Sequence, residues 1–212
     1  MKKLLTTSAL LLVITATVLR AQQSHVGILL NTVTSNLNYG DMNSSLSGYK
    51  ESIRGIRAGL SWQAGLTKNF SVVTEAYFVR KGGGLDNGNP LNGVNSALKL
   101  NTIEVPVLAR IHAGRFYFNA GPYANYIFSG KRTSDAEETK SISFGQGPDE
   151  LRRWEAGVQA GAGYMFNLKK KRLAVDFRYA HGMTSISSSS DLYNRTFSIN
   201  VVLLKPLKGR GQ

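Results

Sequence analysis

Eight ionisable residues fall at alternate positions of strand-like segments, and they are the residues of this chain best suited to chemistry. Four are basic and four are acidic: Arg57, Lys81, Arg110 and Arg178 against Glu75, Glu104, Glu155 and Asp176. Carboxylates enclosed near other charges can acquire shifted pKa values and act as acids or bases. The balance of charge instead favours a structural network of ion pairs, because unpaired buried charges are costly. A lining of one sign would have indicated an ion-selective pore.

Two other groups of residues could do chemistry, but their spacing does not support it. His181 precedes a serine-rich segment at Ser185 and 187–190, and Ser and His on an outer face would suit a lipid-modifying barrel enzyme. Low complexity alone accounts for this segment, so a flexible loop is the favoured interpretation. His25 and His112 have no ligand partners at metal-binding spacing, and the chain contains no cysteine. We therefore expect no enzymatic activity, no metal and no cofactor.

The elements that would position these residues are strands in which apolar and polar side chains alternate. The clearest is segment 102–112, where aliphatic residues from Ile103 to Ile111 occupy one face and Glu104 and Arg110 the other. A membrane-spanning strand takes roughly 9–11 residues with this alternation. The chain contains eight such segments, at 25–36, 53–66, 70–81, 102–112, 116–128, 154–166, 173–180 and 196–204.

Short and long connections alternate between these segments. The short ones are 67–69, 113–115 and 167–172, and the long ones are 38–52, 82–97, 129–153 and 182–195. In bacterial outer-membrane barrels the short turns face the periplasm and the long loops face outside. The pattern predicts an all-β fold: an eight-stranded antiparallel up-and-down transmembrane β-barrel of the outer-membrane type, with both termini periplasmic.

A soluble eight-stranded barrel of the lipocalin type would show the same alternation with its faces exchanged. The membrane alternative is favoured because aromatic residues collect at two depths of the apolar face, as at two membrane interfaces. One group is Trp62, Phe70, Phe116, Tyr164 and Phe166, and the other is Phe78, Tyr126, Phe128, Trp154 and Phe197. Gly157, Gly161 and Gly163 share the polar face, which suits a narrow interior crowded by side chains of other strands.

The N-terminus has the organisation of an exported protein. Lys2 and Lys3 precede an apolar run over residues 4–19, which is short for a transmembrane helix of roughly 20 residues. A cleavage point follows Ala21. We predict a signal peptide over 1–21, a barrel over 22–207 and a short basic tail over 208–212.

The chain is basic, with 26 Lys and Arg against 13 Asp and Glu. Part of the excess lies at 169–172 and 205–210, on the side expected to be periplasmic. The simpler explanation of this basic excess is that the turns are solvated. The functional interpretation is that the basic side chains contact anionic lipid headgroups. Nucleic acid is not an expected partner, because its recognition needs a basic groove with interleaved aromatic residues and because the expected location excludes it.

Five segments in order carry a resemblance to a known family. They are EAYFVRKGG at 75–83, LKLNTIEVPVLAR at 98–110, FYFNAGPYANY at 116–126, GVQAGAGYMF at 157–166 and RYAHGMTSI at 178–186. The chain resembles a family of small bacterial outer-membrane barrels that includes the PorT-like proteins, and the resemblance covers essentially the whole mature chain. It implies an eight-stranded outer-membrane barrel and, for most members of the family, no assigned activity. The member PorT belongs to a secretion system for surface proteins, a role that membership of this broad family does not transfer.

The leading functional interpretation is a non-enzymatic outer-membrane barrel that is structural or accessory to a secretion or surface assembly. A narrow pore and a lipid-modifying enzyme are the alternatives. The expected partners are outer-membrane lipids, the barrel assembly machinery during biogenesis, and a secretion-system or surface protein recognised by loops 82–97 and 129–153. The barrel is expected to be monomeric.

Overall fold

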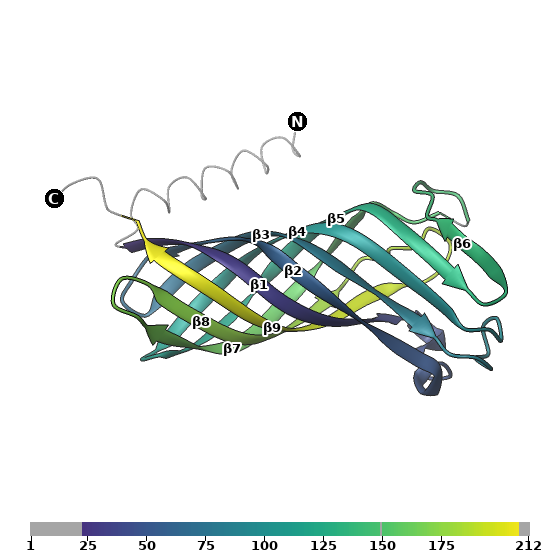
Figure 1. The fold of residues 1–212 in the computed structure, drawn as a ribbon, viewed down its shortest axis with the longest axis horizontal. Coiled ribbons are helices and arrows are strands. Elements are labelled where there is room, and N and C mark those ends of the chain that lie inside the picture. Colours follow the sequence, from purple (N-terminus) through teal and green to yellow (C-terminus); the bar gives the residue numbers. More distant parts are fainter. Residues whose placement is uncertain (1–22, 149, 208–212) are drawn as a thin grey trace.

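A computed structural model describes residues 23–148 and 150–207, in which eight long strands close into an antiparallel barrel (Figure 1). The strands are β1 Gln23–Asn38, β2 Lys50–Gly65, β3 Phe70–Leu85, β4 Ser96–Ala113, β5 Phe116–Ser134, β7 Trp154–Asn167, β8 Arg172–Gly182 and β9 Tyr193–Pro206. A ninth strand, β6 Glu137–Ser141, is short. The expected signal peptide and basic tail lie outside the described residues.

The barrel closes by pairing its first strand with its last. Each strand pairs with its neighbours in the order β1, β2, β3, β4, β5, β7, β8, β9, and β9 returns to β1 with Asn31 opposite Asn200. The predicted eight-stranded antiparallel barrel is therefore confirmed. β6 pairs only with the last residues of β5, where Lys131 lies opposite Ser141, and forms a hairpin that projects beyond the barrel (Figure 1).

The two ends of the barrel differ. Short turns at 66–69, 114–115 and 168–171 lie at one end together with the start of β1 and the end of β9, and we call this the turn end (Figure 1). The longer connections and β6 lie at the opposite end, which we call the loop end. Two short 3₁₀ helices, η1 Gly40–Asn43 and η2 Ser47–Tyr49, belong to the loop end. Within the described ranges, no helix is long and apolar enough to cross a membrane.

Several strands continue further toward the loop end than the sequence predicted. Segment 82–97 was expected to be a loop, but Gly82, Gly83 and Gly84 extend β3 and pair with residues 97–99 of β4. The composition of this segment is typical of a loop. The close approach of β3 to β4 explains why one of these positions is a glycine: Gly82 has φ 147°, and a Cβ there would collide with the Leu98 carbonyl oxygen. Likewise, the expected loop 129–153 contains the end of β5 and all of β6.

The outer surface of the barrel is apolar. Ile28, Leu30 and Leu60 are 65–68% exposed, whereas Leu29, between the first two, is 1% exposed and points inward. Aromatic residues of different strands pack near both ends of this surface, with ring centroids of Phe116 and Tyr164 4.9 Å apart at the turn end. At the other end, Phe78 of β3 and Phe128 of β5, the two strands that flank β4, have ring centroids 5.8 Å apart. Apolar residues outside and charged residues inside are the arrangement of a membrane barrel, not of a soluble one.

Candidate functional site

All eight ionisable residues singled out from the sequence lie in the barrel interior, and each is at most 2% exposed: Arg57, Glu75, Lys81, Glu104, Arg110, Glu155, Asp176 and Arg178. Alternation explains their common direction, because successive side chains of a strand point to opposite faces. They form two groups of ion pairs, one nearer the turn end and one nearer the loop end.

The group nearer the turn end is centred on Arg178. Its Nη1 donates to Glu75 Oε2 at 2.6 Å, and its Nη2 lies 3.2 Å from Asp176 Oδ2. Arg110 Nη2 approaches the same Asp176 oxygen at 3.9 Å, and the Arg110 guanidinium stacks on Tyr117 at 4.1 Å from the ring centroid. Arg110 and Arg178 thus share Asp176, and Glu75 supplies the second negative charge that balances the two arginines.

The group nearer the loop end is centred on Lys81. Its Nζ lies 3.0 Å from Glu104 Oε2 and 3.1 Å from Glu155 Oε2. Arg57 Nη2 lies 3.8 Å from Glu104 Oε1, and its guanidinium covers the ring of Tyr77 at 4.2 Å. Each buried charge therefore has a partner of opposite sign, as buried ions require.

Neutral side chains complete the two groups, and nothing in the sequence marks these residues as partners of the charges. Tyr77 donates its hydroxyl to Glu104 at 2.5 Å, and Tyr123 donates to Glu155 at 2.9 Å. Asn200 donates to Asp176 at 2.6 Å. Alternation places these residues on the inner face, but it gives no information on which inward residues meet across the lumen.

Interior glycines make room for these aromatic side chains. A Cβ at Gly163 would lie 2.5 Å from Cζ of Tyr117, and a Cβ at Gly157 would lie 2.6 Å from Cε1 of Tyr123. The small residues of β7 thus face large ones of β5, its neighbour in the barrel. The expectation of a narrow interior crowded by side chains from other strands is met at these two positions.

An apolar cluster covers the charged interior at the loop end, and we call it the apolar cap. Its members are at most 9% exposed and are Leu37, Leu98, Leu100, Ile127, Leu151, Ile186 and Leu192. Leu151, Ile186 and Leu192 come from connections between strands, not from the barrel wall. The connections after β6 and β8 therefore fold back over the lumen.

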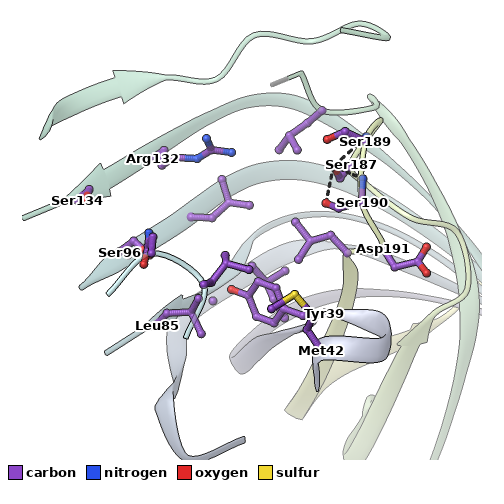
Figure 2. Close-up of a pocket in the computed structure, with 18 of the residues that line it drawn as sticks. Tyr39, Met42, Leu85, Ser96, Arg132, Ser134, Ser187, Ser189, Ser190 and Asp191 are labelled. Carbon is purple, nitrogen blue, oxygen red and sulfur yellow. Dashed lines mark hydrogen bonds between the residues drawn. The ribbon is translucent and has the colours of Figure 1, made fainter. Parts of the chain in front are cut away.

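Above the apolar cap lies a cavity of about 700 Å³, the loop-end cup (Figure 2). Leu37, Leu98, Leu151 and Leu192 belong to both its lining and the cap. Figure 2 shows the polar and apolar residues around it, which include Tyr39, Met42, Leu85, Ser96, Arg132, Ser134, Ser187, Ser189, Ser190 and Asp191. Burial raises the pKa of Tyr39 to about 12, although the positive charge of Arg132 opposes the shift. At neutral pH the Tyr39 hydroxyl is therefore a hydrogen-bond donor.

The serine-rich segment was expected to be a flexible loop, but it is held by its own hydrogen bonds. Ser185 Oγ donates to the Ser190 carbonyl oxygen at 2.9 Å and accepts from the backbone N–H of Leu192 at 3.2 Å. Ser187 Oγ lies 3.1 Å from Ser190 Oγ (Figure 2). Ile186 and Leu192 also anchor the segment in the apolar cap. The low complexity of the sequence gives no indication of this order.

His181 lies at the end of β8, where its ring packs on Tyr179 with centroids 6.2 Å apart. Its cross-strand neighbours are Val158 and Arg195. The hydrogen bonds found for the serine hydroxyls in the described part of the chain do not involve this histidine. Across the same residues, no three His, Asp or Glu side chains gather as metal ligands do.

Comparison with known proteins identifies the family. The family model described as "Outer membrane protein beta-barrel domain" matches residues 20–188. The chain therefore belongs to this family of β-barrels of the bacterial outer membrane. No curated protein matches the sequence.

Three solved structures resemble the barrel remotely. Ail, the attachment invasion locus protein of Yersinia pestis, has 13% identity over 86% of this chain and 99% of that chain, with a TM-score of 0.45. Neisserial surface protein A has 10% identity over 84% and 96%, with a TM-score of 0.48. OprG from Pseudomonas aeruginosa has 11% identity over 90% and 98%, with a TM-score of 0.44.

Proposed function

We propose that this protein is a non-enzymatic outer-membrane barrel with a filled interior, whose loop end serves as an accessory to a secretion or surface assembly, as in the PorT-like proteins. The observation that carries the proposal is the ion pair between Arg178 and Glu75. The two residues belong to β8 and β3, which stand on opposite walls of the ring of strands. Because these two side chains meet across the full width of the barrel interior, they leave little room for a permeant solute or a substrate.

The loop end is the surface that such a barrel offers for recognition. The loop-end cup has an apolar floor, and Arg132, Asp191 and Ser189 lie around it. Binding sites are commonly concave and mainly apolar, with a few polar groups that fix orientation. Since functional loops are usually presented by a rigid scaffold, the packed apolar cap beneath the cup supports this role. We propose that the loop end faces outside and that both termini are periplasmic, because short periplasmic turns are typical of such barrels.

Neither alternative gains support from a specific contact. A narrow pore would need the paired charges to move out of the lumen, at the cost of breaking buried ion pairs. A lipid-modifying enzyme would need an activated serine, whereas Ser185 and Ser187 bond within their own segment. We therefore propose that the protein is not an enzyme.

Copurification from native membranes tests the proposal. The variant Arg132→Glu with Asp191→Lys reverses two of the charges at the cup and preserves the net charge. A variant with Lys99→Glu alters an exposed side chain of β4 that does not line the cup. We expect a stoichiometric partner of the wild-type protein to be lost from the first variant and kept by the second. If both variants keep every partner and all three barrels show the same heat-modifiable migration, the cup is not the recognition surface.

A further inference from the structure

A second cavity opens at the turn end, at the far side of the charged interior from the loop-end cup. Its volume is about 460 Å³. We call it the turn-end cavity, and its lining residues that matter here are His25, Gln63, Lys68, His112, Arg115 and Arg172. They come from β1, β2, β4, β8 and two turns, so the cavity lies where the inner walls of several strands end.

The turn-end cavity is basic on every side. None of its lining residues is Asp or Glu, whereas Lys68, Arg115 and Arg172 each contribute a positive charge. The turns at 66–69, 114–115 and 168–171 also contain no acidic residue, and the last adds three lysines. In the described part of the chain, none of the ion pairs involves these side chains, since the interior carboxylates pair with other cations. Uncompensated charges of one sign around a concave, low-dielectric mouth concentrate ions of the opposite sign.

The uncharged polar side chains of the lining are hydrogen-bonded to one another. Gln63 Oε1 accepts from Arg110 Nη1 at 3.2 Å, which turns the amide nitrogen of Gln63 toward Ser71 Oγ at 3.2 Å. His112 Nε2 lies 3.0 Å from the same Ser71 oxygen. The cavity thus presents imidazole, amide, guanidinium and ammonium groups, which are the donor types that bind oxyanions.

We propose that the turn-end cavity binds a phosphate group. Guanidinium and ammonium groups are the usual protein partners of phosphate, and guanidinium can bind two oxygens at once. Three positive side chains without paired acids favour an anion of more than one charge over a single carboxylate. The phosphate could be free or carried by a lipid headgroup, and both sources present the same chemistry. This inference does not depend on the function proposed for the loop end.

Titration of the purified barrel with inorganic phosphate, in a non-ionic detergent, is the first test. We expect saturable one-to-one binding that weakens at least tenfold in the double variant Arg115→Gln with Arg172→Gln, since each charged hydrogen bond contributes about 1.5–3 kcal/mol. The double variant Lys99→Gln with Lys131→Gln removes the same charge from exposed positions of β4 and β5 at the loop end. It should bind as the wild type does. Equal weakening in both double variants would reduce the effect to overall charge and overturn the proposal.

A lipid experiment identifies the source of the phosphate. Barrels in nanodiscs of mixed phosphatidylglycerol and phosphatidylcholine are released into a mass spectrometer, and the lipids retained on each barrel are counted. Retention of phosphatidylglycerol by the wild type but not by the Arg115→Gln, Arg172→Gln variant assigns a headgroup. Binding of inorganic phosphate without lipid retention assigns a free anion. If the wild type binds neither probe, the proposal is wrong.

Discussion

Arg178 and Glu75 form an ion pair across the interior of the barrel, with Nη1 of the arginine 2.6 Å from Oε2 of the glutamate. The residues are 103 positions apart in the sequence. In the ring of eight strands, β3 and β8 are separated by four steps in either direction, so the pair joins opposite walls. Such a contact fixes the distance between these walls and occupies the space where a pore would run.

Removal of Glu104 should destabilise the barrel strongly. Glu104 accepts hydrogen bonds from Tyr77 and Lys81 and lies 3.8 Å from Arg57. Glu104→Ala leaves these cations with too few carboxylates in a dry interior, and we expect a loss of about 3–5 kcal/mol in the free energy of unfolding. Urea unfolding in detergent micelles would measure it.

The matched control for this prediction is Glu137→Ala. Glu137 also forms an ion pair, with Lys140 at 2.9 Å, but both side chains are more than half exposed. Exposed pairs contribute little because water screens them. Equal unfolding midpoints for the Glu104 and Glu137 variants would show that the interior charges are solvated, contrary to this account.

A methyl group added at Gly163 should overpack the lumen. Its Cβ would lie 2.5 Å from Cζ of Tyr117 and 2.5 Å from Cβ of Asp176. Gly163→Ala should cost about 1–3 kcal/mol, as overpacking of tight interiors does. Gly48→Ala is the control, because nothing lies within 4 Å of its added Cβ. A neutral effect of Gly163→Ala in thermal unfolding would mean that the interior is looser than described.

A charge on the lipid face should be costly at the middle of β9. Outward residues from Phe197 to Leu203 are apolar and 38–49% exposed, and Arg195 and Lys205 bound this run. Val201→Arg should cost roughly 2–4 kcal/mol if its position is near the bilayer midplane. Val201→Leu, which keeps the face apolar, should fold into vesicles as the wild type does. Equal folding yields for the Arg and Leu variants would contradict contact with acyl chains.

Alternation of side chains predicted the barrel and the direction of its charged residues well. Glu104 lies between Ile103 and Val105, so an outward aliphatic face requires an inward carboxylate. The same rule could not predict that Glu104 meets Lys81, because cross-lumen contacts depend on how the strands are staggered around the barrel. It also missed the strand ending at Leu85, because Gly82–Gly84 have the composition of a loop but pair with β4.

The loop-end cup could not be predicted from the sequence, because it also depends on contacts between segments that are far apart in the chain. Its floor combines Leu37, Leu98, Leu151 and Leu192, which are brought together only after the barrel closes and the connections fold inward. The serine-rich segment showed no pattern that predicts order. Ile186 holds the segment in place because it packs in the apolar cap against residues that are distant in the sequence.

Single-channel recording of the purified wild-type protein in planar bilayers tests the filled interior most directly. Because paired side chains such as Arg178 and Glu75 bridge the lumen, we predict no stepwise current at voltages that leave the barrel folded. Insertion is verified independently by protection of the strands from protease in the same lipid. A stable and reproducible unitary conductance from the inserted wild-type barrel would contradict the account and favour the narrow-pore alternative.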